Sequence, residues 1–258
     1  MTTVLVTGGT GALGRPAVAR LREQGHEVRV LSRRSGAGTH VGDLATGMGA
    51  AAAAGGAEVI VHAASDTPFG RSDREQTAHL VSVAHEARHL LYVSIVGIDK
   101  IPFRYYRRKL ACEQLISSSG IPFTILRATQ FHELIAFIGR STERLPLAAL
   151  PLDFQFQTVA AADVAGRVAE LVVGEPVARI LDFGGPEVLT LAQMADAWKA
   201  TRRRPRKVVR LPLPGKVAQA FREGRNTCPD QAAGRQTWAE FLAAGAPVPY
   251  SIRRRRDA

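Results

Sequence analysis

Tyr105 and Lys109 are the residues whose types and spacing suggest chemistry most directly. They lie four positions apart, so on a helix they share one face. An ammonium group one turn from a phenol stabilises the phenolate and can lower the pKa of the tyrosine. Such a tyrosine can exchange a proton with a carbonyl or alcohol oxygen. The spacing favours Tyr105 for this role; the adjacent Tyr106, or simple packing of both rings, is the alternative.

A strand and a helix must position this pair. The apolar run at 90–94 predicts a strand that ends in the hydroxyl group of Ser94. A loop through Pro102 follows, and the next helical segment closes at Gly120. Ser94 could therefore hydrogen-bond the same substrate oxygen as Tyr105, and we expect Ser94, Tyr105 and Lys109 to form the catalytic set.

A glycine-rich segment, 7–14, lies between an apolar run at 4–6 and a helical pattern at 15–24. Strand, glycine turn and helix together are the setting in which such glycines bind a dinucleotide. Gly8 permits the tight turn, Gly11 lets the backbone approach a pyrophosphate, and Gly14 allows close packing of helix on strand. Free N–H groups at the helix start then face the anion. The predicted contact residues are Gly8, Thr10, Gly11, Ala12, Leu13 and Gly14.

The second predicted strand, 27–31, ends in Ser32, Arg33 and Arg34. In dinucleotide-binding folds an acidic residue at this point binds the 2′-hydroxyl of NAD, whereas arginine accommodates the 2′-phosphate of NADP. Two guanidinium groups can pair with a phosphate, and the segment has no acid. The pattern predicts NADP(H) as the cofactor; NAD(H) is the alternative if the arginines are only solvated. Beside a nicotinamide, the tyrosine would move its proton while hydride is transferred.

Further apolar runs alternate with helical patterns. Strands are expected at 39–41, 59–61, 121–126 and 179–183, and the alternation predicts an α/β fold with a doubly wound parallel sheet, the Rossmann fold. Small residues after the strand at 59–61 leave room for a cofactor; they are Ala63, Ala64 and Ser65. The segment after 121–126 should pass the nicotinamide at Thr129 and begin the substrate wall at Gln130 and Phe131.

The remaining patterns outline the rest of the chain. Helical spacing predicts a helix over 73–87 with Asp73 as a plausible cap, one from 162 to about 173, and one capped by Thr190. The prolines within 133–156 suit a loop-rich lid after an apolar helix. We expect a Rossmann domain at 1–183 with a lid-like insertion at about 131–158. A small C-terminal substrate-binding region with a basic tail is expected at 184–258.

Composition narrows the class of protein. The chain of 258 residues carries a formal net charge of +11, much of it in 202–207 and 253–256. These blocks lack interleaved aromatic residues and a recognition-helix pattern, so solvated loops are a better interpretation than nucleic-acid binding. No apolar stretch is long enough to span a membrane. Cys112 and Cys228 form neither a disulfide framework nor a metal-ligand spacing. We expect a cytoplasmic protein without a metal, as a monomer or homodimer, acting on a small molecule.

Together these residues resemble the atypical short-chain dehydrogenase/reductases, and especially their NmrA-like NAD(P)H-binding branch. The resemblance covers roughly residues 2 to 195. It is carried by the segments 7–14, 31–33, 92–99, 105–109, 126–131 and 163–165.

The resemblance implies a role for each matched position. Gly8, Gly11 and Gly14 would hold the pyrophosphate and Arg33 the adenosine end. Asp43 and Leu44 would lie near adenine, Ala63 and Ala64 beside the ribose, and Lys109 at the nicotinamide ribose. Ser94 and Tyr105 would reach the reacting oxygen, although only eleven positions separate them, fewer than in most catalytic members.

Three functions fit these observations. The first is an NADPH-dependent oxidoreductase that reduces a small carbonyl, quinone or conjugated acceptor by hydride transfer. The second is a non-catalytic NADP(H)-binding redox sensor, because the branch also contains members that bind the nucleotide without turnover. The third, sugar-nucleotide epimerisation, uses the same tyrosine and lysine, but the region after the sheet is short for enclosing a nucleotide sugar. The presence of Ser94, Tyr105 and Lys109 together favours the reductase.

Overall fold

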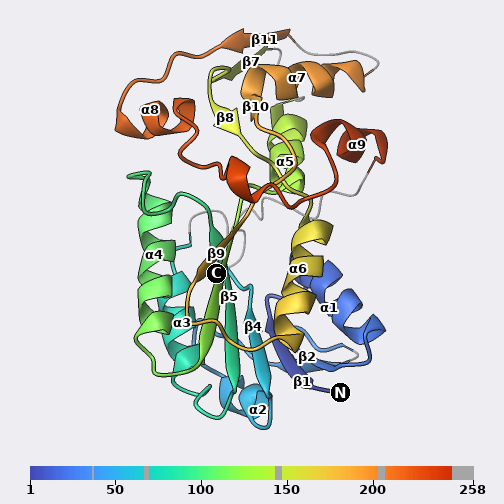
Figure 1. Ribbon diagram of the computed structural model, residues 1–258, viewed down its shortest axis with the longest axis vertical. Coiled ribbons are helices and arrows are strands. Elements are labelled where there is room, and N and C mark those ends of the chain that lie inside the picture. Colours follow the sequence, from blue (N-terminus) through green and yellow to red (C-terminus); the bar gives the residue numbers. More distant parts are fainter. Residues whose placement is uncertain (37, 67–69, 143–146, 203–206, 246–258) are drawn as a thin grey trace.

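The computed structural model describes residues 1–36, 38–66, 70–142, 147–202 and 207–245. Its centre is a seven-stranded sheet in the order β3-β2-β1-β4-β5-β6-β9, in which all neighbouring strands run parallel (Figure 1). The strands are β1 (Thr3–Thr7), β2 (Glu27–Ser32), β3 (Thr39–Val41), β4 (Val59–His62), β5 (His89–Ile95), β6 (Phe123–Ala128) and β9 (Ile180–Phe183). The winding direction reverses between β1 and β4, which confirms the predicted doubly wound Rossmann fold.

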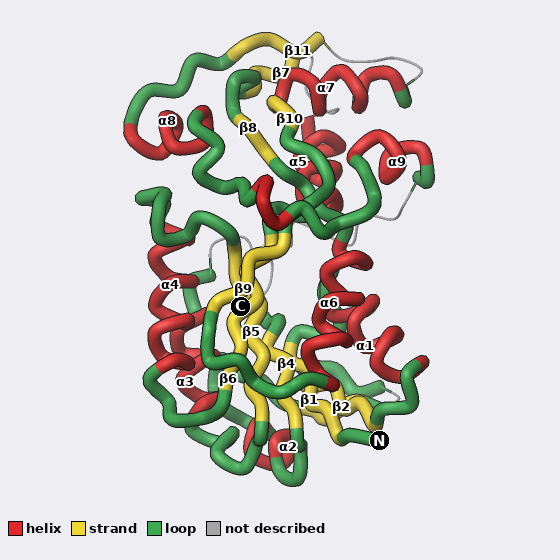
Figure 2. The backbone as a smooth tube through the Cα atoms, viewed as in Figure 1, coloured by secondary structure: helices red, strands yellow, loops and turns green. Residues whose placement is uncertain are grey.

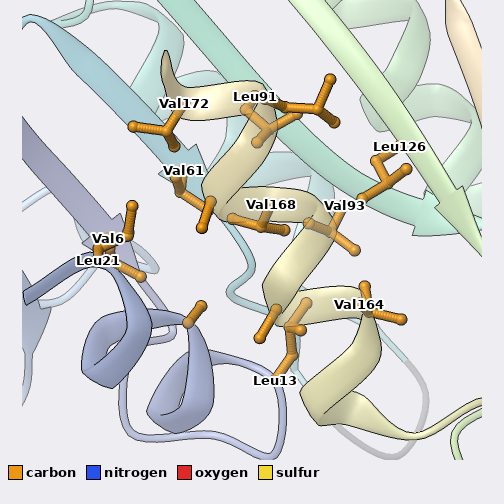
Figure 3. Close-up of a cluster of buried hydrophobic side chains, with 14 of the residues drawn as sticks. Val6, Leu13, Leu21, Val61, Leu91, Val93, Leu126, Val164, Val168 and Val172 are labelled. Carbon is orange, nitrogen blue, oxygen red and sulfur yellow. The ribbon is translucent and has the colours of Figure 1, made fainter. Parts of the chain in front are cut away.

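Helices α1 (Gly14–Glu23) and α6 (Ala161–Val173) cover one face of the sheet. Figure 3 shows their apolar side chains meeting those of the central strands, among them Val6 and Val61. Parallel strands that are covered on both faces need apolar side chains at consecutive positions. The runs at 4–6 and 59–61 are accordingly buried at every position.

The opposite face is covered by α2 (Ala50–Ala54), α3 (Asp73–Val81) and α4 (Arg104–Ser117). Because strand residues alternate between faces, Leu5 packs on this side while its neighbours Val4 and Val6 pack under α1 and α6. The prediction that the helix starting at Asp73 reaches Ala87 is wrong. The N–H groups of residues 83 and 84 donate to carbonyls three residues back, and these tight turns redirect the chain into β5.

A second layer stands over the carboxyl ends of the strands and is built from two separate segments (Figure 2). The first contributes α5 (His132–Thr142), β7 (Leu147–Leu150) and β8 (Gln155–Phe156). The second contributes β10 (Leu189–Thr190), α7 (Leu191–Ala200), β11 (Lys207–Arg210), α8 (Lys216–Arg222), the 3₁₀-helix η1 (Pro229–Gln231) and α9 (Trp238–Ala243). β7 pairs in parallel with β11 and β8 pairs antiparallel with β10, so the two segments are interleaved.

This layer has its own small core of Ile135, Met194, Trp238 and Phe241. The Trp238 indole N–H also donates to the Met194 carbonyl oxygen at 3.0 Å. The predicted cap of α7 is confirmed, since Thr190 and Gln193 form a reciprocal capping box. The segment expected to be a loop-rich lid also contains a strand. Residues 147–150 form β7, whose partner β11 comes far later in the sequence.

Two sequence features remain without a structural description. Residues 203–206 and 253–256, which carry much of the basic charge, lie outside the described residues. Within the described ranges, no helix combines the length and the apolar character needed to cross a bilayer.

Candidate functional site

The glycine turn after β1 has the shape that a pyrophosphate-binding turn requires. Gly8 has a φ of +72°, and a Cβ there would lie 2.6 Å from the Ala64 nitrogen. A Cβ on Gly14 would overlap the Gly8 carbonyl oxygen and the Gly9 Cα. A Cβ on Gly11 would meet only the Gly8 oxygen, at 3.2 Å. Gly8 and Gly14 are thus needed for packing, while a Cβ on Gly11 would crowd only the Gly8 oxygen.

The other residues of the turn hold its shape. The Gly11 N–H donates to the Gly8 carbonyl oxygen at 2.9 Å, and the Thr10 carbonyl oxygen accepts from Arg15 Nε at 2.9 Å. Leu13 is buried in the core beneath α1, whereas Ala12 is half-buried. α1 begins at Gly14 with no side-chain cap, so its first N–H groups point at the turn.

The predicted adenosine end lies at the carboxyl ends of β2 and β3. Ser32 Oγ accepts from the Arg34 N–H at 3.1 Å, and the side chains of Arg33 and Arg34 are exposed. Asp43 closes the following turn by accepting from the Ala45 N–H at 2.9 Å, and Leu44 is buried in the core. The arginines therefore stand at an open edge next to a rigid turn.

At the end of β4, Ala63 and Ala64 pass directly beside Gly8. Ser65 then begins a hydrogen-bonded chain that sequence reasoning missed. Its hydroxyl donates to Asp73 Oδ2 at 2.8 Å and lies 3.4 Å from the Tyr105 hydroxyl oxygen. Asp73, only 2% exposed, also accepts from a backbone N–H in the loop after β4. The carboxylate thereby fixes the loop and its serine against Tyr105.

The two adjacent tyrosines have different surroundings. Tyr105 is half-buried, and its burial raises the pKa of the phenol to about 12. Tyr106 is 3% exposed, accepts a hydrogen bond from Gln130 Nε2 at 2.9 Å, and packs near Phe221 of the upper layer. Burial raises the pKa of Tyr106 as well. Tyr106 is thus committed to packing, and Tyr105 is the more accessible phenol.

Lys109 contacts Val93 and Tyr92 and forms no hydrogen bond with Tyr105 among the described residues. Its side chain is buried, its Nζ donates to the Val93 carbonyl oxygen at 3.4 Å, and it lies 4.5 Å from the centre of the Tyr92 ring. Burial lowers the pKa of this lysine, and the nearby Asp73 carboxylate partly offsets the effect. Lys109 is not among the groups that shift the pKa of Tyr105, which burial raises rather than lowers.

Ser94 is brought to the same edge but not to Tyr105. It is 3% exposed, and its Oγ has no hydrogen-bond partner among the described residues. A buried hydroxyl without a partner carries a free-energy cost, which a ligand that supplies a hydrogen bond would remove. Hydrogen bonds therefore link Tyr105 through Ser65 to Asp73, whereas Ser94 and Lys109 form no hydrogen bond with Tyr105 among the described residues.

The segment after β6 is held rigidly. Thr129 is buried, and its Oγ1 accepts from the Gly185 N–H at 3.2 Å. Phe131 is partly buried against the core below α6. Arg127, 9% exposed, binds both carboxylate oxygens of Glu113 at 2.9 and 2.7 Å and one of Asp99 at 3.1 Å. This ion-pair network ties the end of β6 to α4.

A second buried polar chain runs under the site. His62 Nδ1 lies 2.7 Å from Thr7 Oγ1, and Nε2 lies 3.1 Å from Thr77 Oγ1. Burial, helped by the positive charge of Lys109, lowers the pKa of His62 to about 3, so the ring is neutral. His62 is thus a packed residue of the core. Among the described residues, no three or more side chains of His, Cys, Asp or Glu are placed so that they could hold a metal ion.

The residues present fit a dinucleotide. An open glycine turn, a helix start without a side-chain cap, small residues at the end of β4 and an unpartnered hydroxyl at the end of β5 all lie along one edge of the sheet. This edge includes the switch point between β1 and β4, where ligands bind in doubly wound folds.

Comparison with known families agrees with this geometry. The model of an NAD(P)H-binding family matches residues 8–173, from the glycine turn through α6, and the chain belongs to this family. The match confirms the predicted nicotinamide dinucleotide cofactor. It also confirms, at the level of the NAD(P)H-binding family, the predicted resemblance to the NAD(P)H-binding branch of the atypical short-chain dehydrogenase/reductases.

Individual proteins add detail. The chain is similar to a (4-alkanoyl-5-oxo-2,5-dihydrofuran-3-yl)methyl phosphate reductase of Streptomyces griseus, at 32% identity over 138 residues, or 50% of this chain and 48% of that one. The alignment thus spans about half of the relative's length.

Two solved structures share the fold. One is an NADPH-dependent quinone oxidoreductase of Escherichia coli in complex with NADPH, with a TM-score of 0.78 and 17% identity, covering 93% of this chain and 99% of that one. The other is a short-chain dehydrogenase/reductase superfamily protein of Agrobacterium tumefaciens with bound NAD, with a TM-score of 0.72 and 19% identity, covering 94% and 95% of the two chains.

Proposed function

We propose that the protein is an NADPH-dependent reductase of a small carbonyl, quinone or conjugated acceptor, with Tyr105 as the proton donor. One observation carries the proposal. The Tyr105 hydroxyl lies 3.4 Å from Ser65 Oγ, in the loop that leaves β4 and passes beside the glycine turn at Ala63 and Ala64. Burial raises the pKa of this phenol, so it is protonated at neutral pH and holds the proton that an alkoxide or enolate takes up after hydride addition. Ser65, held by Asp73, orients its hydroxyl group.

In this proposal the chain's residues divide the work of binding. Gly8, Gly11 and Gly14 shape the turn whose N–H groups receive the pyrophosphate, with Thr10, Ala12 and Leu13 holding its backbone. Ser32, Arg33 and Arg34 receive the 2′-phosphate, with Asp43 and Leu44 beside the adenine and Ala63 and Ala64 beside the ribose. Ser94, Lys109 and Thr129 line the nicotinamide end, and Gln130 and Phe131 begin the substrate wall. The bound cofactor supplies the hydride.

The names of similar proteins support this class of reaction. The Streptomyces relative is a reductase of a phosphate-bearing dihydrofuranone, and the Escherichia coli structure is a quinone oxidoreductase bound to NADPH. The absence of an acid beside Arg33 and Arg34 supports the choice of NADPH over NADH.

Stopped-flow fluorescence of protein-bound NADPH, challenged with quinones, enones, aldehydes and ketones, tests the proposal. We expect oxidation by at least one acceptor, and a preference for NADPH that falls at least tenfold in Arg33→Asp. Tyr105→Phe should lower kcat by 10²–10⁴-fold for a carbonyl acceptor. Tyr106→Phe, which removes a hydroxyl bonded to Gln130, is the matched control and should keep most of the activity.

The second candidate, a non-catalytic NADP(H)-binding sensor, is favoured by one observation: Lys109 and Ser94 are not joined to Tyr105. Tight NADPH binding without oxidation by any acceptor in the panel would establish the sensor function and reject the reductase.

A further inference from the structure

A cavity of about 180 Å³ lies where α3 and α4 begin, against the ring of Tyr105. It is lined by Arg71, Phe103, Arg104, Tyr105 and Arg108. Its wall thus contains three guanidinium groups and two aromatic rings, and no acidic side chain.

The positive charge of this wall is uncompensated in part. Arg104 and Arg108 are four positions apart on α4, a spacing at which like charges repel. Arg104 is exposed and forms no hydrogen bond or ion pair within the described parts of the chain. α4 also begins without a side-chain cap, so its positive end adds to the field. An anion in the cavity would give Arg104 a partner.

The aromatic part of the wall favours an apolar part of a ligand rather than its charge. The rings of Phe103 and Tyr105 meet edge to face, with centroids 6.4 Å apart, and Phe103 is 39% exposed. Such rings offer an apolar surface to a flat, conjugated group. Tyr105 belongs to both features, because its ring lines the cavity while its hydroxyl meets Ser65.

We propose that this cavity binds the anionic group, a phosphate or a carboxylate, of a flat conjugated substrate. Guanidinium groups match both anions with paired, charge-assisted hydrogen bonds. Anchored by Arg71, Arg104 and Arg108, such a substrate places its carbonyl beside Tyr105. The inference rests on the proposed reductase function, which it deepens by naming the substrate class.

The test measures binding separately from turnover. The full chain is saturated with NADP⁺, so that the cofactor site is filled, and titrated by calorimetry with phenyl phosphate, benzoate and uncharged benzyl alcohol. We expect the anions to bind and benzyl alcohol not to bind, and Arg104→Gln to weaken anion binding about tenfold, the loss of one charge-assisted contact. Arg107→Gln is the matched control: Arg107 lies on the same helix, outside the cavity lining, and contacts the Pro102 carbonyl oxygen.

The outcomes separate the two proposals. The anion that binds more tightly identifies the group and supports the inference. Equal losses in Arg104→Gln and Arg107→Gln, or equal affinities for benzyl alcohol and the anions, would overturn it. If the anions bind through Arg104 while no acceptor oxidises NADPH, the reductase fails and the anion site stands. If neutral quinones are reduced by a protein without anion affinity, the reductase stands and the anion site fails.

Discussion

His62 makes the stability of the fold depend on pH. The ring is buried between Thr7 and Thr77, and its pKa falls from 6.5 to about 3 on folding. The unfolded chain therefore binds a proton between these values that the native chain does not. The stabilisation is fully present above pH 6.5 and is lost as the pH falls toward 3. Replacing His62 by glutamine removes this titration.

The size of the effect follows from the shift. One pKa unit corresponds to about 1.36 kcal/mol, so a fall from 6.5 to about 3 amounts to about 5 kcal/mol when complete. Relative to pH 8, His62 should lower the free energy of unfolding by about 1 kcal/mol at pH 5.5 and about 3 kcal/mol at pH 4.5. These amounts are comparable to a substantial part of a domain's net stability.

The assay is urea unfolding of the wild type and His62→Gln from pH 4.5 to 8. The difference between the two free energies cancels the contributions of other titrating groups, His89 and His132 among them, whose pKa values burial also lowers. The difference should shift steadily in favour of His62→Gln below pH 6.5. Two curves that stay parallel across this range, or an NMR titration of His62 near pH 6.5 in the folded protein, would refute the reasoning.

Two further sets of substitutions test the turn and the ion-pair network. Gly14→Ala should destabilise the protein by about 1–3 kcal/mol and weaken NADPH binding, because the methyl group overlaps the Gly8 oxygen. Gly11→Ala, whose Cβ would crowd the Gly8 oxygen less severely, should lose clearly less stability in urea unfolding and still lose fluorescence-detected NADPH binding at least tenfold. Comparable stability losses in both variants would contradict this reading. Arg127→Met should lower the free energy of unfolding by about 3–5 kcal/mol, because Glu113 stays buried without its partner. Adding Glu113→Met should restore much of this stability in thermal or urea unfolding. A double variant no more stable than Arg127→Met would argue against a buried-charge penalty.

Much of the fold could be predicted from local patterns. Buried parallel strands are apolar at consecutive positions, so the runs at 4–6 and 59–61 indicate their own strands. The glycine spacing likewise reflects contacts made within a few residues, as between Gly8 and Gly14. β7 could not be predicted in this way, since its partner strand starts at Lys207 and the flanking prolines suggest a loop.

The site was predictable in position but not in its contacts. Helical spacing shows that Tyr105 and Lys109 share a face, but not where each side chain points. Tyr105 meets Ser65 because the loop after β4 is fastened by Asp73, and Lys109 turns inward to Val93. These contacts join elements from three parts of the chain, so the spacing of residues within one helix or strand cannot predict them. The roles predicted for Ser94, Thr129 and Gln130 stay predictions.

The interleaved strands of the upper layer have a consequence for how the chain is made. During synthesis β7 leaves the ribosome well before β11, so its edge waits without a partner until residues 207–210 follow. Ile135 similarly lacks its packing partners until Met194 and Trp238 have been synthesised. The central sheet can close once β9 has emerged, ahead of the layer above it. Recombination that transfers only the C-terminal segment therefore transfers half of a folding unit. This layer can be exchanged between proteins only when the segment with α5, β7 and β8 and the C-terminal segment are transferred together.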